Sequence, residues 1–211
     1  MWNELNHPWQ KAFELAWISF KKGSIPIGCV IVNEHEELVT EGRNQIYDRS
    51  SQHPLALSIM AHAEMTALSQ LKVDDHPNVR EYTLYTTMEP CPMCFGTSVM
   101  MNIRNIVYAA RDRFAGASVL NTSMDYIKEK NISITFAGPE VEVFQLVLQT
   151  AFEAQRRHPR MQAILSAWAI SNKKAVDLGL SLAKEHFFNH NISISDIYDG
   201  VMKHYYGIEQ P

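Results

Sequence analysis

Two short motifs, separated by one predicted β-strand, constrain the fold of this chain more than any other feature. The first is His62-Ala63-Glu64, and the second is Pro90-Cys91-Pro92-Met93-Cys94. Structural zinc sites have four protein ligands, whereas catalytic sites have three and leave one position for water. His62, Cys91 and Cys94 are three suitable ligands, and Glu64 is left to move protons. A fold that uses these residues must bring the two motifs together.

Each motif also predicts its local structure. Cys91 and Cys94 are three residues apart at a predicted helix start, so both sulfurs lie on one face of the helix. The positive end of the helix dipole there favours thiolates, which are the form that binds metal. His62 and Glu64 are two residues apart and cannot share a face inside a regular helix. They can converge only if His62 lies at the start of its helix.

Apolar periodicity predicts strands that alternate with helices. Apolar residues three and four apart indicate helices, and short β-branched or aromatic runs indicate strands. Helices are expected over 8–22, 61–71, 91–101, 119–130 and 141–157, and strands over 25–32, 38–41, 82–86, 106–109 and 132–136. The alternation in the second half predicts parallel crossovers with helices on both faces of a sheet. The polar loop 44–57 is longer than an ordinary connection and is a candidate for function.

The chain divides at His158-Pro159, which interrupt the last helix of the α/β part. We expect a first domain over 1–157 and a helical C-terminal extension over 158–211, broken near 189–191 and ended by Gly207. The extension is expected to pack against the sheet or a second subunit. The alternative is a lid over the site.

Composition excludes several classes of protein. Hydrophobic residues make up 46% and charged residues 20% of the 211 residues, which is typical of a globular chain. The net charge of −4 argues against a strongly nucleic-acid-binding protein, although a local basic patch could still exist. Three cysteines do not suggest a disulfide framework. No apolar run is long enough to span a membrane or to serve as a signal peptide, so no membrane partner is expected and a cytoplasmic location fits best.

Two further residues could change the ligand set. Cys29 lies in the apolar strand 25–32, where an inert buried thiol is the more common interpretation. His53 lies in the polar loop before the first motif, and a solvated histidine is more common there. A fourth protein ligand would close the site and indicate a structural zinc.

The combined pattern H-x-E…P-C-x-x-C is the signature of zinc nucleobase deaminases. The chain resembles the cytidine deaminase-like superfamily over roughly residues 8–157, and within it the branch of guanine deaminases and tRNA adenosine deaminases. The matching segments are 26–28, 42–44, 61–64, 84–86, 89–94, 110–112 and 116–117. The resemblance implies a three-layer α/β/α sandwich with a five-stranded mixed sheet, whose fifth strand runs parallel to the fourth.

By this resemblance His62, Cys91 and Cys94 hold Zn²⁺ and Glu64 is the catalytic proton shuttle. Asn44 and the backbone N–H of Ala63 are the implied substrate contacts. The other interpretation of Asn44 is a turn-capping side chain. Glu89 is expected to support the cysteines from behind, although an exposed loop glutamate is the alternative.

The resemblance implies a zinc-dependent hydrolytic deaminase that releases ammonia from a free nucleobase or nucleoside, and a homodimer. Deamination of tRNA adenosine to inosine is the first alternative. Two departures weigh against it: Leu57 to Met60 replace the Asp-Pro-Thr approach of the tRNA enzymes, and the C-terminal extension has mixed charge where bacterial tRNA enzymes have a basic helix. A catalytically silent, zinc-stabilised binding module is the second alternative.

Overall fold

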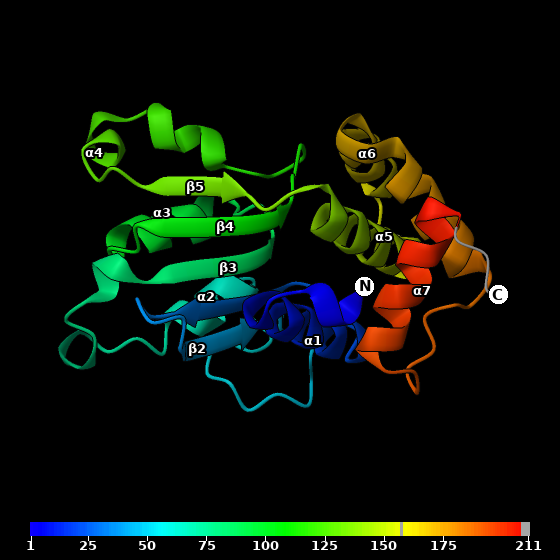
Figure 1. Cartoon of the computed structure of the whole chain (residues 1–211), viewed down its shortest axis with the longest axis horizontal. Helices are drawn as coiled ribbons and strands as arrows, with labels where there is room; N and C mark the ends of the chain where they lie inside the picture. The colour runs from blue at the N-terminus through cyan, green and yellow to red at the C-terminus, as the bar shows by residue number, and fades with distance from the viewer. Residues whose placement is uncertain (157, 208–211) are drawn as a thin grey trace.

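A mixed sheet of five strands organises the chain, in a computed structural model that describes residues 1–156 and 158–207. The strands are β1 (Gly28–Val32), β2 (Leu38–Arg43), β3 (Thr83–Met88), β4 (Asn105–Ala110) and β5 (Ser133–Phe136), and their spatial order is β2-β1-β3-β4-β5 (Figure 1). β1 is antiparallel to β2 and β3, whereas β3, β4 and β5 are mutually parallel. The predicted mixed sheet and its parallel fifth strand are confirmed.

Helices cover both faces of this sheet. The helices α1 (His7–Lys21) and α5 (Pro139–Arg156) share one apolar core with the sheet, and α2 (Ala63–Leu68) and α3 (Pro92–Met100) share a second core on the other face. Short 3₁₀ helices lie at Trp2–Glu4, Val73–Asp75 and Val79–Glu81. The three-layer α/β/α sandwich is therefore confirmed.

Two glycines let helices lie directly on the strands. A Cβ atom on Gly28 of β1 would lie 2.0 Å from the carbonyl oxygen of Ala12 in α1. A Cβ atom on Gly42 of β2 would lie 2.2 Å from the carbonyl oxygen of Ala63 in α2. Both distances are far below a van der Waals contact, so a larger residue would push the helix away. Gly42 thus sets the position of the helix that begins at the first motif.

Some predicted boundaries were wrong for local reasons. The helix expected over 119–130 is a 3₁₀ helix η4 (Ser118–Thr122) followed by one helical turn, α4 (Asp125–Lys128). The hydroxyls of Thr122 and Ser123 donate to the carbonyl of Val119, which competes with helical hydrogen bonding. α2 ends at Leu68 instead of Leu71. Just after this end, the side-chain amide of Gln70 donates a hydrogen bond to the Thr66 carbonyl. β1 begins at Gly28 instead of Ile25, because Pro26 cannot donate to a sheet.

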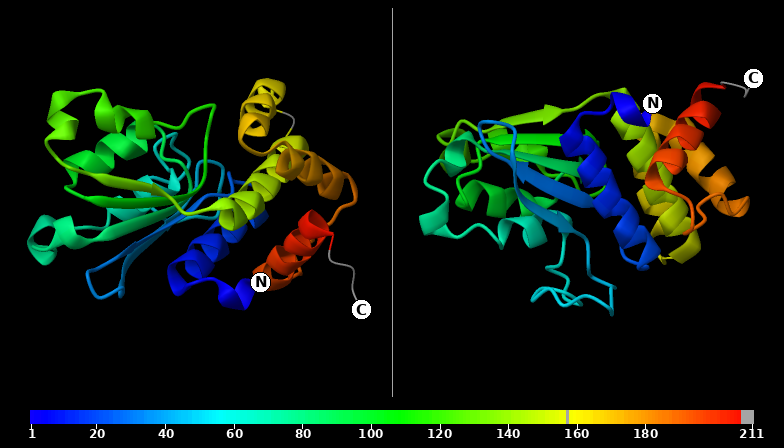
Figure 2. Two further views of the ribbon diagram at one scale, coloured as in Figure 1. Left: turned by 45° about the horizontal axis from the view of Figure 1, so that its top comes forward. Right: turned by 60° about the horizontal axis from the view of Figure 1, so that its bottom comes forward.

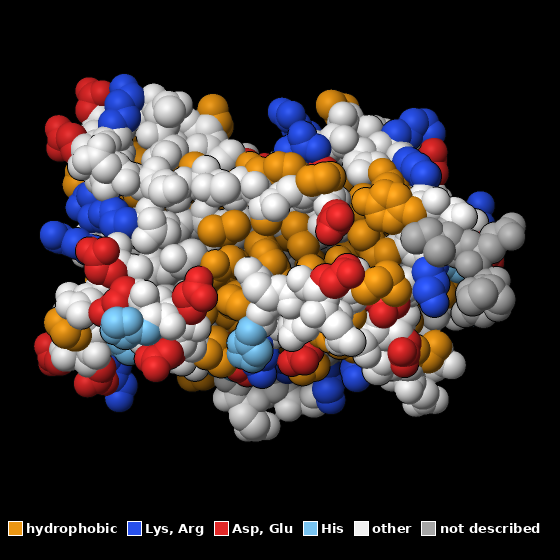
Figure 3. Space-filling model, in the orientation of Figure 1, with side chains coloured by type: hydrophobic (Ala, Val, Ile, Leu, Met, Phe, Trp, Pro, Cys, Tyr) orange, Lys and Arg blue, Asp and Glu red, His pale blue; other side chains and the backbone are white. Residues whose placement is uncertain are grey.

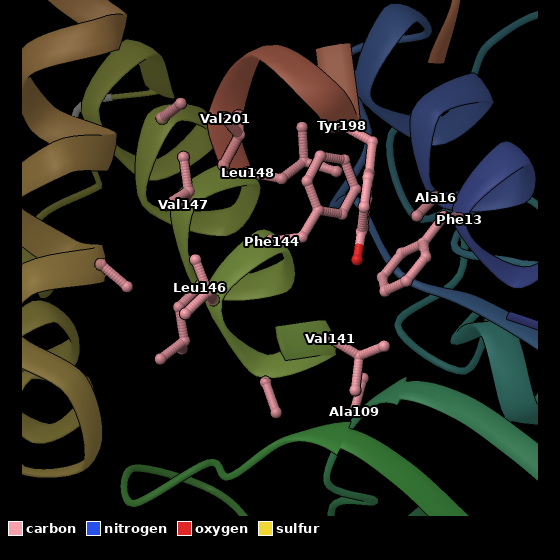
Figure 4. Close-up of a cluster of buried hydrophobic side chains, with 14 of the residues drawn as sticks. Phe13, Ala16, Ala109, Val141, Phe144, Leu146, Val147, Leu148, Tyr198 and Val201 are labelled. Carbon is pink, nitrogen blue, oxygen red and sulfur yellow. The ribbon is translucent and has the colours of Figure 1, made fainter. Parts of the chain in front are cut away.

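The C-terminal extension consists of α6 (Met161–Lys184) and α7 (Ile194–Tyr206), and α7 ends at Gly207 with a φ of +67°. The predicted break between the two helices and the predicted helix end at Gly207 are confirmed. The extension packs on α1 and α5, because α5 buries apolar side chains on several faces. Figure 4 shows Tyr198 of α7 against Phe13 and Phe144, and its ring centroid is 4.8 Å from that of Phe144.

The predicted boundary between 1–157 and 158–211 stays a prediction. Arg157, the expected last residue of the α5 helix, and residues 208–211 lie outside the described residues. Within the described residues, no helix is long and apolar enough to cross a membrane.

Two features stand out at the surface of the molecule. The loop between β2 and α2 projects from the body of the molecule (Figure 2) and exposes Leu57 and Ile59, which are 60% and 80% exposed. A groove of about 380 Å³ lies between the N-terminal segment and the start of α5, with Leu5, Trp9 and Val141 in its lining. Figure 3 shows apolar side chains gathered in this hollow with acidic side chains around it. α1 and α5 therefore leave part of this face uncovered.

We expect Gly42→Ala to destabilise the fold by about 1–3 kcal/mol, because its Cβ overlaps the α2 backbone. Gly96→Ala in α3 is the matched control: a Cβ there meets nothing within 4 Å, and alanine should stabilise the helix by about 0.5–1 kcal/mol. Urea unfolding of both variants measures the difference. Equal stability of the two variants would contradict the close approach at Gly42.

Candidate metal centre

Both motifs lie at helix starts near one edge of the sheet. His62 is the N-cap residue of α2, with φ −69° and ψ 156°, so it precedes the helical turn that contains Glu64. Cys91 is the N-cap residue of α3, and Pro92 occupies the first helical position, where no N–H is needed. The prediction that His62 lies at the start of its helix is confirmed, and this placement lets it converge with the cysteines.

The three side chains are spaced as zinc ligands. His62 Nδ1 lies 3.6 Å from Cys91 Sγ and 3.5 Å from Cys94 Sγ, and the two sulfurs are 3.6 Å apart. Tetrahedral zinc with ordinary bond lengths separates nitrogen and sulfur by about 3.6 Å and two sulfurs by about 3.8 Å. One ion therefore fits between all three atoms. This is the only such cluster among the described residues, and Cys29 and His53 are not part of it.

The ligand side chains perturb one another electrostatically. Hydrogen bonds from Cys94 and His62 outweigh burial and lower the pKa of Cys91 to about 4. The same bond to Cys91, together with burial, raises the pKa of Cys94. Burial acts to lower the pKa of His62, but the bond to Cys91 and the charge of Glu64 outweigh it and raise that pKa. At neutral pH one thiolate is thus present, and a dication stabilises the second.

Glu64 lies beside the ligands without joining them. Its side chain is 3% exposed, and its Oε1 accepts a hydrogen bond of 3.1 Å from the Thr86 hydroxyl on β3. Burial is the main cause that raises the pKa of Glu64. Cys29 pairs with Thr86 across the β1–β3 ladder, and burial raises its thiol pKa well above the ordinary value. The site thus has three metal ligands and one buried carboxyl that can hold a proton.

Asn44 shows features of both interpretations made from the sequence. Its Oδ1 accepts from the Ser24 hydroxyl at 2.7 Å and from the Ile46 N–H at 3.2 Å, which is a local turn contact. Its Nδ2 is buried and has no hydrogen-bond partner among the described residues. Ala63 is fully buried and is the first residue of α2, so its N–H has no acceptor within the helix. Their roles as substrate contacts stay predictions.

Glu89 is not an exposed loop side chain. Its carboxylate accepts from the Asp112 N–H at 3.0 Å and from the N–H and hydroxyl of Ser118 at 3.2 and 2.5 Å. These bonds join the turn before Cys91 to the loop after β4. The described contacts do not include one to a cysteine sulfur, so the expected support of the cysteines stays a prediction.

Two residues that orient the site are not predicted from the sequence. Thr86 belongs to a strand that resembles the family, and alternation along β3 places its hydroxyl towards α2. Ser24 follows the end of α1 and orients the Asn44 carboxamide, and no local pattern predicts this pairing across 20 residues of chain.

Comparison with known proteins shows the family. The model of the cytidine and deoxycytidylate deaminase zinc-binding region matches residues 3–110, just over half of the chain. The chain therefore belongs to this family of zinc-dependent deaminases, and zinc is its metal cofactor.

Similar proteins include two named tRNA deaminases. The tRNA-specific adenosine deaminase 2 of Danio rerio is 32% identical over 155 residues, which is 69% of each chain. The tRNA-specific adenosine deaminase of Haemophilus influenzae is 30% identical over 161 residues, 73% of this chain and 86% of the other.

Solved structures with the same fold include two deaminases. The structure of a tRNA:A34 deaminase has a TM-score of 0.52 at 22% identity and covers 63% of this chain and 92% of its own. A guanine deaminase from Nitrosomonas europaea also has a TM-score of 0.52 at 22% identity, over 71% of this chain and 86% of its own. At this identity the likeness extends to the fold alone.

We expect one zinc per chain, lost in Cys91→Ala and retained in Cys29→Ala. Cys91 is a member of the three-atom cluster, whereas Cys29 is a buried cysteine outside it and is the matched control. Elemental analysis after dialysis measures the metal content. Zinc loss from both variants, or from neither, would contradict this ligand set.

Proposed function

We propose that this protein is a zinc-dependent hydrolytic deaminase of a free nucleobase or nucleoside. The observation that carries the proposal is the buried Glu64 beside a three-ligand metal site. A structural zinc would need a fourth protein ligand, and it would have no use for a proton carrier. This arrangement also argues against a catalytically silent binding module.

Glu64 performs the proton transfers of this reaction. Zinc, when bound, polarises a water molecule and lowers its pKa. Glu64 accepts a proton as this water adds to the amino-bearing carbon, and delivers it to the adjacent ring nitrogen. It then takes the second proton of the added water from the new hydroxyl group and transfers it to the departing amino group, so that amine and water become carbonyl and ammonia. Thr86 orients the carboxylate through its 3.1 Å bond. Burial raises the pKa of Glu64 above its ordinary value.

Asn44 and Ala63 are the proposed substrate contacts. Ser24 and the turn at Ile46 occupy Asn44 Oδ1, so the carboxamide presents its NH₂ group as the remaining donor. The N–H of Ala63 is a second donor at the start of α2. Two oriented donors suit the acceptor atoms of a base edge.

Three arginines that are already paired within the chain support a small substrate. Arg43 pairs with Asp48 at 2.5 Å, Arg111 pairs with Glu142 at 2.7 Å, and Arg156 donates to the Tyr47 hydroxyl at 2.6 Å. A polynucleotide is bound mainly by cations that neutralise phosphates. Arginines held by acidic or aromatic partners, on a chain of net charge −4, are poorly suited to that role.

Deamination of tRNA adenosine is the second candidate. It is supported by the 30–33% identity to proteins named as tRNA-specific adenosine deaminases. The two candidates share the zinc centre and Glu64 and differ only in the substrate that reaches them.

A homodimer is part of the proposal. Leu57, Ile59 and Met60 are all exposed close to His62, and apolar side chains that gather on a surface mark interaction sites. Light scattering should give twice the 24.1 kDa mass of one chain. A monomeric mass at micromolar concentration would argue against the dimer.

We expect Glu64→Gln to lower turnover at least about 100-fold, because the amide cannot carry protons. Zinc content should be unchanged, since Glu64 is outside the ligand cluster. Ammonia release and elemental zinc are measured on the same sample. Unchanged turnover would remove Glu64 from the mechanism.

The substrate assay compares ammonia release from adenine, guanine, cytosine and their nucleosides with release from an anticodon stem-loop that carries a wobble adenosine. Turnover of a free base or nucleoside supports the first proposal, and turnover of the stem-loop alone supports the second. Turnover of neither, with zinc bound, would favour the silent module.

A further inference from the structure

We infer that Trp168 of the C-terminal extension is a positioning residue for the active site. It acts through Asp112 on residues 111–118, the segment after β4, which we term the β4 loop. The consequence for catalysis rests on the proposed deaminase function, whereas the contact between α6 and the loop does not.

The β4 loop is fastened to the turn that contains Cys91. The Glu89 carboxylate accepts three hydrogen bonds from Asp112 and Ser118 at the two ends of the loop. The Ala117 N–H donates to the Pro90 carbonyl at 2.9 Å, and Pro90 directly precedes Cys91. A Cβ atom on Gly116 would lie 2.4 Å from the Glu89 carboxyl carbon, so the loop lies directly on that side chain. Movement of the loop would therefore also move the turn that precedes Cys91 in the chain.

Asp112 connects this loop to the extension. Its Oδ1 accepts from the N–H groups of Phe114 and Ala115 at 2.9 and 3.1 Å, which shapes the loop. The same oxygen accepts from Trp168 Nε1 at 2.9 Å. Burial is the main cause that raises the pKa of Asp112. Each hydrogen-bond donor to this carboxylate therefore helps to stabilise its charged form. The indole N–H is the donor to this carboxylate from outside the loop.

A kink in α6 brings Trp168 to the loop. Asn172 has non-helical φ and ψ of −154° and 86°, and it divides α6 into two straight parts. The Asn172 Oδ1 accepts from the Ala175 N–H at 3.0 Å and from the Tyr205 hydroxyl of α7 at 3.3 Å. In the second part, Gly179 lies against Val147 and Thr150 of α5. The second part is thus anchored on α5, and the first part turns towards the β4 loop.

The other contacts of the β4 loop hold its first residue or are weaker, so the position of its centre depends on Trp168. Arg111 pairs with Glu142 of α5 and fixes the first residue of the loop. Arg160 lies over the Phe114 ring, 5.0 Å from its centroid, as a second contact from α6. This second contact is a cation–π interaction on a partly exposed ring and is weaker than a hydrogen bond to a carboxylate. Arg113 is exposed at the loop centre and offers a site for trypsin.

The test removes the indole N–H with Trp168→Phe, which also replaces the bicyclic ring by a smaller phenyl ring. The matched control is Trp17→Phe, because both tryptophans are 3% exposed and Trp17 Nε1 has no hydrogen-bond partner among the described residues. Native-state cleavage by trypsin at the Arg113–Phe114 bond is followed by mass spectrometry. Urea unfolding of both variants corrects the rates for global stability.

We expect Trp168→Phe to accelerate this cleavage about tenfold relative to the native chain, and Trp17→Phe to leave the corrected rate within twofold. Equal acceleration in both variants, or none in Trp168→Phe, would overturn the inference. These rates need no substrate, so they decide the loop contact even if the proposed function fails.

The catalytic readout uses a substrate found in the assay panel. Trp168→Phe should raise KM several-fold, with kcat within twofold and full zinc content, because a loosened loop weakens binding before it affects proton transfer. Unchanged KM together with faster cleavage would show that Trp168 holds the loop without positioning the site, and would overturn the catalytic part of the inference.

Discussion

The structure depends on one geometric constraint, which is the convergence of an imidazole nitrogen and two sulfurs within 3.6 Å of one another. Three donor atoms this close are stabilised by a dication. The constraint requires two helix starts near the same edge of the sheet. Gly42 permits it, because only a glycine lets β2 lie against the first turn of α2.

Around this centre, the polar side chains are organised by contacts between distant segments. Ser24 orients Asn44, Thr86 orients Glu64, and Glu89 fastens the β4 loop beside the cysteines. Each contact leaves one group with a defined orientation, which is what a site needs before substrate arrives. The C-terminal extension joins this network through the indole N–H of Trp168, which donates to Asp112.

Periodicity along the chain was sufficient for most of the sheet, since buried strands such as β1 and β3 consist of continuous apolar or β-branched runs. It failed at 119–130, where Thr122 and Ser123 bond their own backbone instead of extending a helix. Periodicity also could not decide whether Glu89 supports the cysteines or is an exposed loop side chain, because a residue in a turn shows no periodic signal. Nothing in the sequence pairs Trp168 with Asp112, because their bond spans 56 residues of chain.

The sequence alone predicted the zinc centre of this protein. Residue types and their spacing in the two motifs predict the ligands, the proton carrier and the metal, because coordination chemistry admits few alternatives. Tertiary structure decided which side chains orient that chemistry and where the extension lies. Those outcomes depend on the kink at Asn172 and on the packing of α6 and α7 against α5 and α1, which arise only when distant segments meet.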